Sequence, residues 1–584
     1  MRRASLVVLA LFSCLISIPI YSQSTSLPSQ STPPPGPKKP VYEPAAVLKV
    51  TTRLVVLDVV ATDRHGHPVT DLQAKDFTVS EDGKQQQLRV FNLRRTQVVA
   101  ATTGSKKLPR LPANIFTNIP SYSQSSSLNI ILLDLLNTDF QDQAYARQRI
   151  LKYLANIPDG EPIAVAVYVL GKKLRLVQDF TSDFPALRNV IKGVNSDQPI
   201  VADSATVGST ADNPDLVAVP PMPVKEFANV YEGPQQLDRR LQYTLDGLSS
   251  LAHHLAGYPG RKNLIWVSTT FPLGIAPDPE QGPNEFENLR DYEQAIVSVS
   301  QTLVDAQVAV YPVDPRGPLG ISMYGGQGSA PSDQSGSLQG DSASGDAEHS
   351  TMKRVAQLTG GKAYFNQNDI DDAIRSSIED GSTYYTLGYY PDNKDWNGRF
   401  RKIEAKVNRH GIKLRYRPGY YALNTRATQD PRLLFIAFER ALKLDSPMST
   451  GLRFEVGMVQ PSDKTQNKVL LNFALDPNAI TFEKEDDGLQ HAKVDCAVQA
   501  YTEKGQLVKG DANTLTVALD GESFRKTMQT FLLAHVYFDL APGSYFLRLG
   551  VMDEHTGLIG TTAAWVTINA IPDATQGKTE EKKP

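Results

Sequence analysis

Cysteine is nearly absent from this chain of 584 residues, which contains only Cys14 and Cys496. Cys14 lies in an N-terminal segment with the features of a removable signal, so the mature chain would keep a single thiol. One thiol cannot build a disulfide framework, and the domains must be large enough to be stable through their own hydrophobic cores. Cys496 lies in a strand-like run, where we predict a buried, unreactive thiol.

A strong charge of either sign is also missing, since the formal net charge is −3 and the pI is about 6.3. Without a basic excess, nucleic acid is not expected as a partner. Long apolar runs are missing after residue 22, and a membrane helix needs about 20 apolar residues in a row. We therefore expect no integral membrane segment once the signal has been removed.

The N-terminus has the order of parts found in a secretory signal peptide. Two arginines precede an apolar run from Leu6 to Ile20, and small and polar residues follow. This order predicts removal of residues 1–22 and export to the periplasm or the extracellular space. The sequence around Cys14 loosely resembles a lipoprotein box, so a lipid anchor at Cys14 is the alternative.

Recognisable catalytic motifs are absent as well. The sequence has no His-Glu-x-x-His pattern, no Gly-x-Ser-x-Gly elbow and no phosphate-binding glycine-rich loop. Its nine histidines show no metal-ligand spacing, and we expect surface or packing roles for them. A non-enzymatic protein is therefore predicted. The alternative is a hydrolase or an accessory subunit of an exported enzyme complex, which would need catalytic groups brought together from distant segments.

Changes in composition along the chain predict its domains. Residues 23–46 form a Pro/Ser-rich linker, and residues 47–95, with short apolar strands between Gly/Asp turns, predict an N-terminal β-sandwich module. Residues 430–570 carry seven short strand patterns that predict a C-terminal β-sandwich. Both sandwiches are expected to be immunoglobulin-like, and residues 571–584 to be a disordered tail.

Residues 126–395 alternate between apolar strands and amphipathic helices. Such alternation predicts a doubly wound, Rossmann-like α/β domain with a mostly parallel sheet. Insertions at 195–233 and 317–350 interrupt it, and we expect the second to be disordered. A β hairpin at 396–424 closes this region. The expected strands are Asn129–Leu135, Ile163–Val169, Asn263–Val267, Val308–Val313, Lys362–Phe365 and Thr383–Tyr389.

The first of these strands ends in polar side chains, Asp134, Asn137 and Thr138. In an open α/β sheet, ligands bind outside the carboxyl ends of the strands. A carboxylate with neighbouring side-chain oxygens at that edge suits Mg²⁺ or Ca²⁺. The alternative is that Asp134 and Thr138 only cap the next helix, whose start is marked by the acids Asp139 and Asp142.

Several separated motifs occur in an order that can be compared with known families. They are Leu54–Asp63, Asp76–Gly83, Leu132–Thr138, Asp142–Arg147, Gly260–Ser268, Thr359–Phe365, Tyr384–Pro391 and Arg417–Tyr421. In this order they resemble the bacterial VWFA-related family first described from Acidobacteria, over about residues 47–422. The resemblance implies a von Willebrand factor A-like (VWFA-like) domain, a type of domain that generally binds ligands, often through a metal-ion-dependent adhesion site.

The resemblance also implies that this metal site is degenerate. The family's site uses an Asp-x-Ser-x-Ser motif, a threonine from a second loop and an aspartate from a third. Asp134 and Thr138 match the ends of the first motif, but Leu136 replaces its first serine, and the third loop at 267–271 has no carboxylate. Thr181 is a candidate for the second-loop threonine by composition only. We therefore expect Mg²⁺ or Ca²⁺ to bind weakly if it binds at all.

These features predict an exported, non-enzymatic VWFA-related protein that binds a protein partner or scaffolds the cell envelope. The sequence does not identify that partner.

Overall fold

The computed structural model describes residues 54–95, 112, 114–120, 127–158, 161, 163–194, 234–269, 293–316, 338–365, 370–422 and 431–570. The predicted signal peptide, the Pro/Ser-rich linker, the insertion at 195–233 and the predicted disordered tail lie outside the described residues. Within the described part of the chain, no helix has the length and hydrophobicity of a membrane span.

The α/β part contains a five-stranded sheet with the order β10-β9-β6-β7-β8. Four of its strands are parallel, and β8 runs antiparallel to β7 at one edge. Beyond β10, Tyr364 makes a single parallel bridge to Val313. The strands are β6 (Ser127–Asp134), β7 (Ile163–Leu170), β8 (Leu174–Thr181), β9 (Lys262–Val267) and β10 (Val308–Val313).

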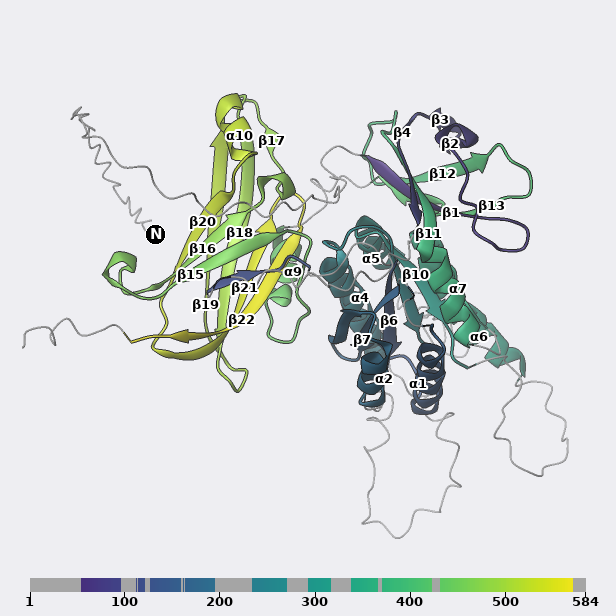
Figure 1. Ribbon diagram of the computed structural model, residues 1–584, viewed down its shortest axis with the longest axis horizontal. Helices are drawn as coiled ribbons and strands as arrows, with labels where there is room; N and C mark the ends of the chain where they lie inside the picture. The colour runs from purple at the N-terminus through teal and green to yellow at the C-terminus, as the bar shows by residue number, and fades with distance from the viewer. Residues whose placement is uncertain are drawn as a thin grey trace, which may run out of the picture. The chain divides into compact units, whose positions relative to one another are not determined.

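Helices cover both faces of this sheet (Figure 1). Every residue of β6 is buried, and successive residues point to opposite faces, so Ile130 joins one core and Ile131 the other. One core includes α4 (Pro234–Leu255), α5 (Glu293–Asp305) and α6 (Leu338–Thr359), and the other includes α1 (Phe140–Ala155), α2 (Phe184–Lys192) and α7 (Ile370–Ser382). This arrangement is doubly wound, as the alternating pattern predicted.

Two four-stranded antiparallel sheets enclose a separate core built from both sides of the α/β segment. Their orders are β13-β1-β11-β4 and β14-β12-β2-β3. The strands are β1 (Val55–Thr62), β2 (Phe77–Glu81), β3 (Lys84–Gln86), β4 (Leu88–Arg95), β11 (Thr383–Tyr389), β12 (Phe400–Val407), β13 (Lys413–Arg415) and β14 (Gly419–Tyr421).

The position of β11 corrects the sequence interpretation, which assigned Thr383–Tyr389 to the parallel sheet. In the structure β11 pairs antiparallel with β1 on one side and β4 on the other, with Leu57 opposite Leu387. A strand buried on both faces has the same apolar pattern in a parallel sheet and in a sandwich, so its sequence could not distinguish them. Similarly, the expected closing hairpin is not a hairpin, because β12 pairs with β14 and β2 while β13 pairs with β1.

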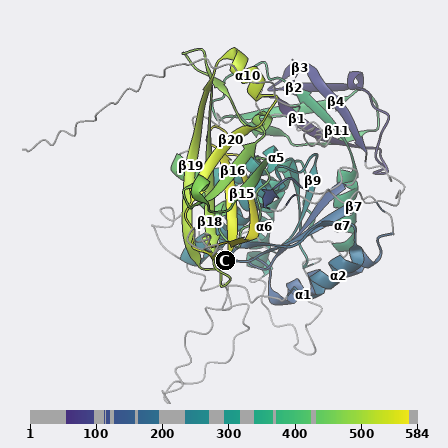
Figure 2. The same cartoon turned by 60° about the vertical axis from the view of Figure 1, so that its left-hand side comes forward.

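The C-terminal region forms two further antiparallel sheets around one core, and all seven predicted strands are present. Figure 2 shows β15, β16 and β20 side by side. The elements are α9 (Pro431–Ala441), β15 (Phe454–Val459), β16 (Val469–Leu475), β17 (Glu483–Lys484), β18 (Gln490–Tyr501), β19 (Leu507–Leu519), α10 (Gly521–Thr527), β20 (Leu532–Phe538), β21 (Gly543–Asp553) and β22 (Ile559–Ile568). Cys496 is fully buried here, and burial raises the pKa of its thiol to about 12, as expected for an unreactive cysteine.

One strand of the C-terminal sheets comes from far away in the sequence. The sequence between residues 96 and 127 is polar and irregular, which is typical of a linker or an excursion, but its residues Ile115–Thr117 form β5, which pairs antiparallel with β15. The next residue, Asn118, is buried and donates to the carbonyl oxygens of Ser449 (3.0 Å) and Leu452 (2.9 Å). The segment therefore contributes a strand and a buried polar anchor to the C-terminal core.

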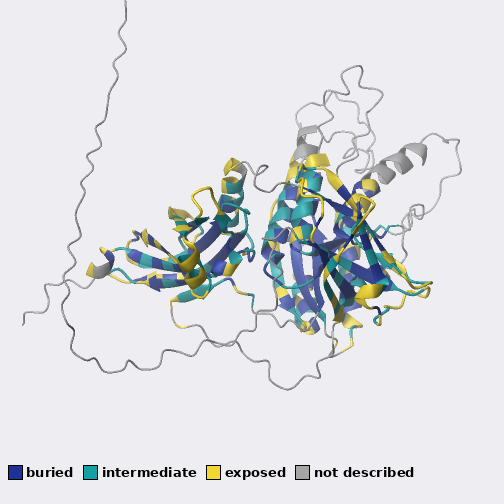
Figure 3. Ribbon diagram, turned by 90° about the horizontal axis from the view of Figure 1, so that it is seen from above, coloured by how far each residue is buried: buried dark blue, intermediate teal, exposed yellow. Residues whose placement is uncertain are grey.

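Part of the second insertion is more ordered than predicted, because residues 338–350 belong to α6, whereas residues 317–337 lie outside the described residues. Its glycine- and serine-rich composition indicated disorder, but Met352 and Val355 pack into the sheet core at helical spacing, and the helix extends back from them. Figure 3 shows in dark blue that buried residues follow the strands and the helix faces that pack against them.

Candidate functional site

The predicted site lies where the strand order of the parallel sheet reverses. β6 lies in the middle of the sheet. The next strands, β7 and β8, lie on one side of it, and the later strands, β9 and β10, lie on the other. Ligands of open α/β sheets bind at this point, outside the carboxyl ends of the strands. Asp134 ends β6 and Val267 ends β9, so Asp134 and the residues after Val267 come together there.

Asp134 is almost completely buried, and both of its carboxylate oxygens accept hydrogen bonds from the chain itself. Oδ1 accepts from the backbone N–H groups of Leu136 (3.1 Å) and Asn137 (2.9 Å). Oδ2 accepts from Asn137 Nδ2 (2.9 Å), Trp266 Nε1 (3.0 Å) and Ser268 Oγ (2.9 Å). Burial raises the pKa of Asp134, and the hydrogen bonds from Asn137, Ser268 and Trp266 act in the opposite direction.

Asn137 extends this network to helix α4. Its side-chain nitrogen donates to Thr244 Oγ1 (2.9 Å) as well as to Asp134. Its side-chain oxygen lies 3.3 Å from Nε and Nη2 of Arg240, which donate to it. Its backbone oxygen accepts from Thr269 Oγ1 (2.7 Å), so Asn137 joins the loops after β6 and β9 to α4.

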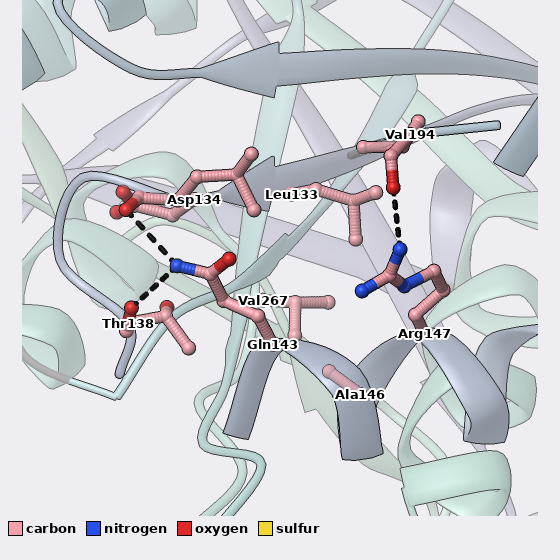
Figure 4. Close-up of a pocket in the computed structure, with 9 residues that line it drawn as sticks. Leu133, Asp134, Thr138, Gln143, Ala146, Arg147, Val194 and Val267 are labelled. Carbon is pink, nitrogen blue, oxygen red and sulfur yellow. Dashed lines mark hydrogen bonds between the residues drawn. The ribbon is translucent and has the colours of Figure 1, made fainter. Parts of the chain in front are cut away.

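Thr138 lies beside a cavity of about 10 Å³, shown in Figure 4. Gln143 points its amide nitrogen at the carbonyl oxygens of Thr138 (2.8 Å) and Leu135 (3.2 Å). The hydroxyl of Thr138 is buried and has no hydrogen-bond partner among the described residues. A cavity of this size has room for about one water molecule.

The residues at this position do not fit a divalent cation. Mg²⁺ and Ca²⁺ need several oxygen atoms that point their lone pairs at one place. Here N–H and O–H donors surround Asp134, and the guanidinium of Arg240 lies behind Asn137. Within the described ranges, no group of three or more His, Cys, Asp and Glu side chains is placed to hold a metal ion.

The capping alternative does not describe Asp134 either. The N-cap of α1 is Asp139, whose side chain makes no capping hydrogen bond, and Asp142 lies in the first turn as predicted. Asp134 instead bonds to the loop before the helix, and this loop also reaches the end of β7 through Leu135 and Leu136, whose N–H groups donate to Leu170. Asp134 is thus a structural centre for the carboxyl edge of the sheet.

Thr181, the candidate for the second-loop threonine, lies at the opposite end of the sheet. It ends β8, and because β8 is antiparallel it pairs there with Val165, near the start of β7. Asp134 instead pairs with Leu170, at the other end of β7. Two other threonines approach the site, Thr269 after β9 and Thr244 on α4, and no local sequence signal marked Thr244.

A second polar cluster at the same edge was missed by the sequence interpretation. Asp314 directly follows β10 and is buried, and it accepts hydrogen bonds from His349 Nε2 (2.9 Å) and Arg316 Nη2 (2.8 Å). Burial alone would raise its pKa, but the bonds from His349 and Arg316 outweigh burial, so the pKa is lowered. Arg316 also donates to the backbone oxygen of Thr269 (2.7 Å), which connects the two clusters. The sequence contains a pattern that could have identified this cluster, because Asp314 follows an apolar strand just as Asp134 does.

No protein-family model matches this chain, and no curated protein matches its sequence. Some solved structures are similar to part of it. An aerotolerance-related membrane protein from Bacteroides fragilis is 13% identical with a TM-score of 0.22, over 43% of this chain and 98% of that one. The conserved hypothetical protein BatB from Bacteroides thetaiotaomicron is 11% identical with a TM-score of 0.20, over 44% and 97%.

The PilB minor pilin from Streptococcus sanguinis is 10% identical with a TM-score of 0.22, over 44% of this chain and 61% of the pilin. Identities and TM-scores this low say nothing about function. The description of the fold therefore rests on the strand order of the sheet and on the helices that cover its two faces.

Proposed function

We propose that this chain is an exported, non-enzymatic protein with a VWFA-like domain that binds a protein partner or scaffolds the cell envelope, in the periplasm or outside the cell. The observation that carries the proposal is that the chain's own donors occupy both carboxylate oxygens of Asp134. A buried carboxylate that accepts five hydrogen bonds from its own chain is not free to hold a metal ion or to act on a substrate.

Partner binding by this domain would then be independent of divalent ions. Adhesion-type VWFA domains, which this chain resembles, complete the coordination of their metal with a carboxylate from the partner. In this chain Trp266 and Ser268 donate to the Asp134 carboxylate, which leaves no metal for a partner's carboxylate to reach. The partner must therefore contact surfaces formed by loops and sheets. Binding should consequently resist chelation.

The test is recovery of partners from the native cell envelope and culture medium, with a tagged chain expressed at its natural level. Cross-linked partners identified by mass spectrometry should be the same in excess Mg²⁺ and in excess EDTA. An untagged strain gives the background. If no protein is enriched above this background in either condition, the binding proposal is wrong, and if EDTA removes the partner, binding depends on a metal.

The Asp314–His349 pair favours one alternative, a hydrolase or an accessory subunit of an exported enzyme complex. A buried carboxylate that orients an imidazole is one half of a nucleophile-activating arrangement. The neighbouring hydroxyls of Ser268 and Thr269, however, donate to Asp134 and to the backbone oxygen of Asn137. Ester and amide substrates offered to the wild type and to His349→Asn distinguish these functions, because only a hydrolase would show turnover that the substitution abolishes.

A further inference from the structure

Residues 399–417 are far more basic than the rest of the chain. They contain eight lysines and arginines and one glutamate, whereas the whole chain has a formal net charge of −3. This basic segment comprises Arg399, β12, the following turn, β13 and the two residues after it. Acids of other elements neutralise part of the charge, since Glu81, Asp71 and Asp380 pair with three of its arginines.

Two lysines of the basic segment are open to an incoming anion, although Glu404 also attracts one of them, Lys406. Lys406 on β12 and Lys413 on β13 are exposed, and within the described part of the chain neither forms an ion pair. Lys402 pairs with Glu404 at 2.6 Å, but this pair lies at the surface, where solvent screens the attraction. An incoming anion can therefore compete with Glu404 for Lys402.

An open groove of about 630 Å³ lies between β12 and β13. Lys402, Lys406 and Arg415 contribute positive charge to its lining, and Glu404 contributes the one negative charge. Leu414, Tyr416 and Pro418 contribute apolar surface. Lys413 lies on the same side of β13 as Arg415, because side chains alternate along a strand. The groove is thus bordered by cations from two strands.

The β12 edge of this groove is a strand edge without a neighbouring strand. β14 pairs only with Phe400–Lys402, and β2 pairs with Ile403–Val407 on the other side. On the open side, the N–H of Ala405 donates to the hydroxyl of Tyr416 (2.9 Å), and this hydroxyl donates to the carbonyl oxygen of Ala405 (3.1 Å). On the same side the N–H of Ile403 donates to the carbonyl oxygen of Pro418 (2.8 Å). The Tyr416 hydroxyl therefore occupies both backbone groups of Ala405, where a further strand would begin to pair beyond Pro418.

We propose that this groove binds an extended, acidic segment of a partner protein, which adds to the open edge of β12 in place of the Tyr416 hydroxyl. The proposal rests on the proposed binding function and names its surface. A free strand edge is matched by another backbone, which supplies alternating N–H and C=O groups. Acidic side chains on that segment meet Lys406, Lys413 and Lys402, so charge sets which segments bind.

The experiment uses the mature full-length protein and a synthetic ten-residue peptide of alternating glutamate and valine, with blocked ends. One control peptide carries lysine in place of glutamate, and another carries proline at its centre, which removes a backbone N–H and disrupts strand pairing. Binding is followed by calorimetry, and hydrogen exchange of the basic segment reports whether the edge of β12 becomes protected.

The wild type should bind the acidic peptide, and Lys406→Glu/Lys413→Glu should weaken binding by about tenfold or more. Lys75→Glu/Lys84→Glu makes the same change of charge at exposed positions outside the groove and should leave binding unchanged. Tyr416→Phe should tighten binding, because the competing hydroxyl is gone. The proline peptide should bind at least about tenfold more weakly, and protection should increase at Ala405.

No binding to the wild type, equal binding to both double variants, or equal binding of the proline peptide would each overturn the proposal. Vesicles containing anionic phospholipid test whether the groove binds a membrane surface and not a protein segment. If they bind in a lysine-dependent way while the peptide does not, the groove recognises a membrane surface instead. If the native partner is recovered equally well with Lys406→Glu/Lys413→Glu, the partner does not bind in this groove, while the proposed binding function stands.

Discussion

Asp134 shows how a side chain at a ligand-binding position can become part of the structure. Its place at the edge of the sheet was predictable, since a carboxylate after an unbroken apolar run lies at a strand's carboxyl end. Its bonding partners were not, because Trp266 and Ser268 are more than 130 positions away and reach Asp134 only through the pairing of β6 with β9. Local patterns contain no information about that register.

Removal of the Asp134 carboxylate should destabilise the fold. Asp134→Ala leaves five buried donors without an acceptor, and we expect the free energy of unfolding to fall by about 3–5 kcal/mol. Asp139→Ala is the matched control, because Asp139 is exposed and makes no side-chain cap, and it should cost less than about 1 kcal/mol. Urea unfolding measures both, and equal losses would mean that the Asp134 network contributes little to stability.

Lys262 should make stability depend on pH. It is buried at the start of β9, where its ammonium donates to the carbonyl oxygen of Tyr258 (2.7 Å). Burial lowers the pKa of Lys262 from 10.5 to about 7, although Asp58 acts in the opposite direction. Between these two values the unfolded chain binds more protons than the folded one, so this contribution to stability rises as the pH increases through that window.

The comparison with Lys262→Met isolates this effect. Relative to the variant, the wild type should gain up to about 1.4 kcal/mol of unfolding free energy per pH unit between about pH 7.5 and about pH 9.5. Guanidinium unfolding at the two pH values gives the difference, in which other titrating groups cancel. Parallel pH profiles for the two proteins would show that Lys262 has an ordinary pKa.

At the scale of elements, local patterns identified most strands but not their partners. The strand Val308–Val313 has the predicted bounds, and the seven C-terminal strands were found within a few residues, apart from the longer β19. Sheet membership was wrong for β11 and unforeseen for β5, because both pair with segments hundreds of residues away. A three-residue strand such as β5 also offers too short a pattern to detect.

The β5 segment should stabilise the C-terminal sheets. The fragment 431–570 alone leaves an edge of β15 exposed, whereas a fragment with residues 112–120 attached through a Gly/Ser linker restores the pairing and the bonds of Asn118. We expect the second fragment to be more stable by about 2 kcal/mol, and Asn118→Ala in it to remove most of the gain. Fragments with the same melting curve would show that β5 is dispensable.

At the scale of the whole molecule, the sandwich core is assembled from segments on both sides of the α/β region. β1 to β4 precede that region and β11 to β14 follow it, and they share one core. Composition predicted the existence of β modules and of an α/β region, because each has its own periodicity. It could not predict this discontinuity, which depends on pairing between strands that lie on opposite sides of the α/β region in the sequence.

The whole chain should also be processed on export. The charged, apolar and small-residue parts of residues 1–22 predict a mature N-terminus near Gln23. Intact-mass measurement of the native protein checks this prediction. An unprocessed Met1 in a cytosolic fraction would contradict export, and a diacylglycerol modification of Cys14 would show a lipoprotein instead.

A calorimetric titration of Mg²⁺, Ca²⁺ and Mn²⁺ into the wild type and Asp134→Ala tests whether the chain's own donors close the Asp134 position and so make partner binding independent of metal. If these donors occupy the carboxylate, neither protein should give heat of binding at millimolar ion, and Asp134→Ala should differ only in stability. A binding isotherm for the wild type that disappears in Asp134→Ala would contradict this expectation and restore a metal-dependent adhesion site.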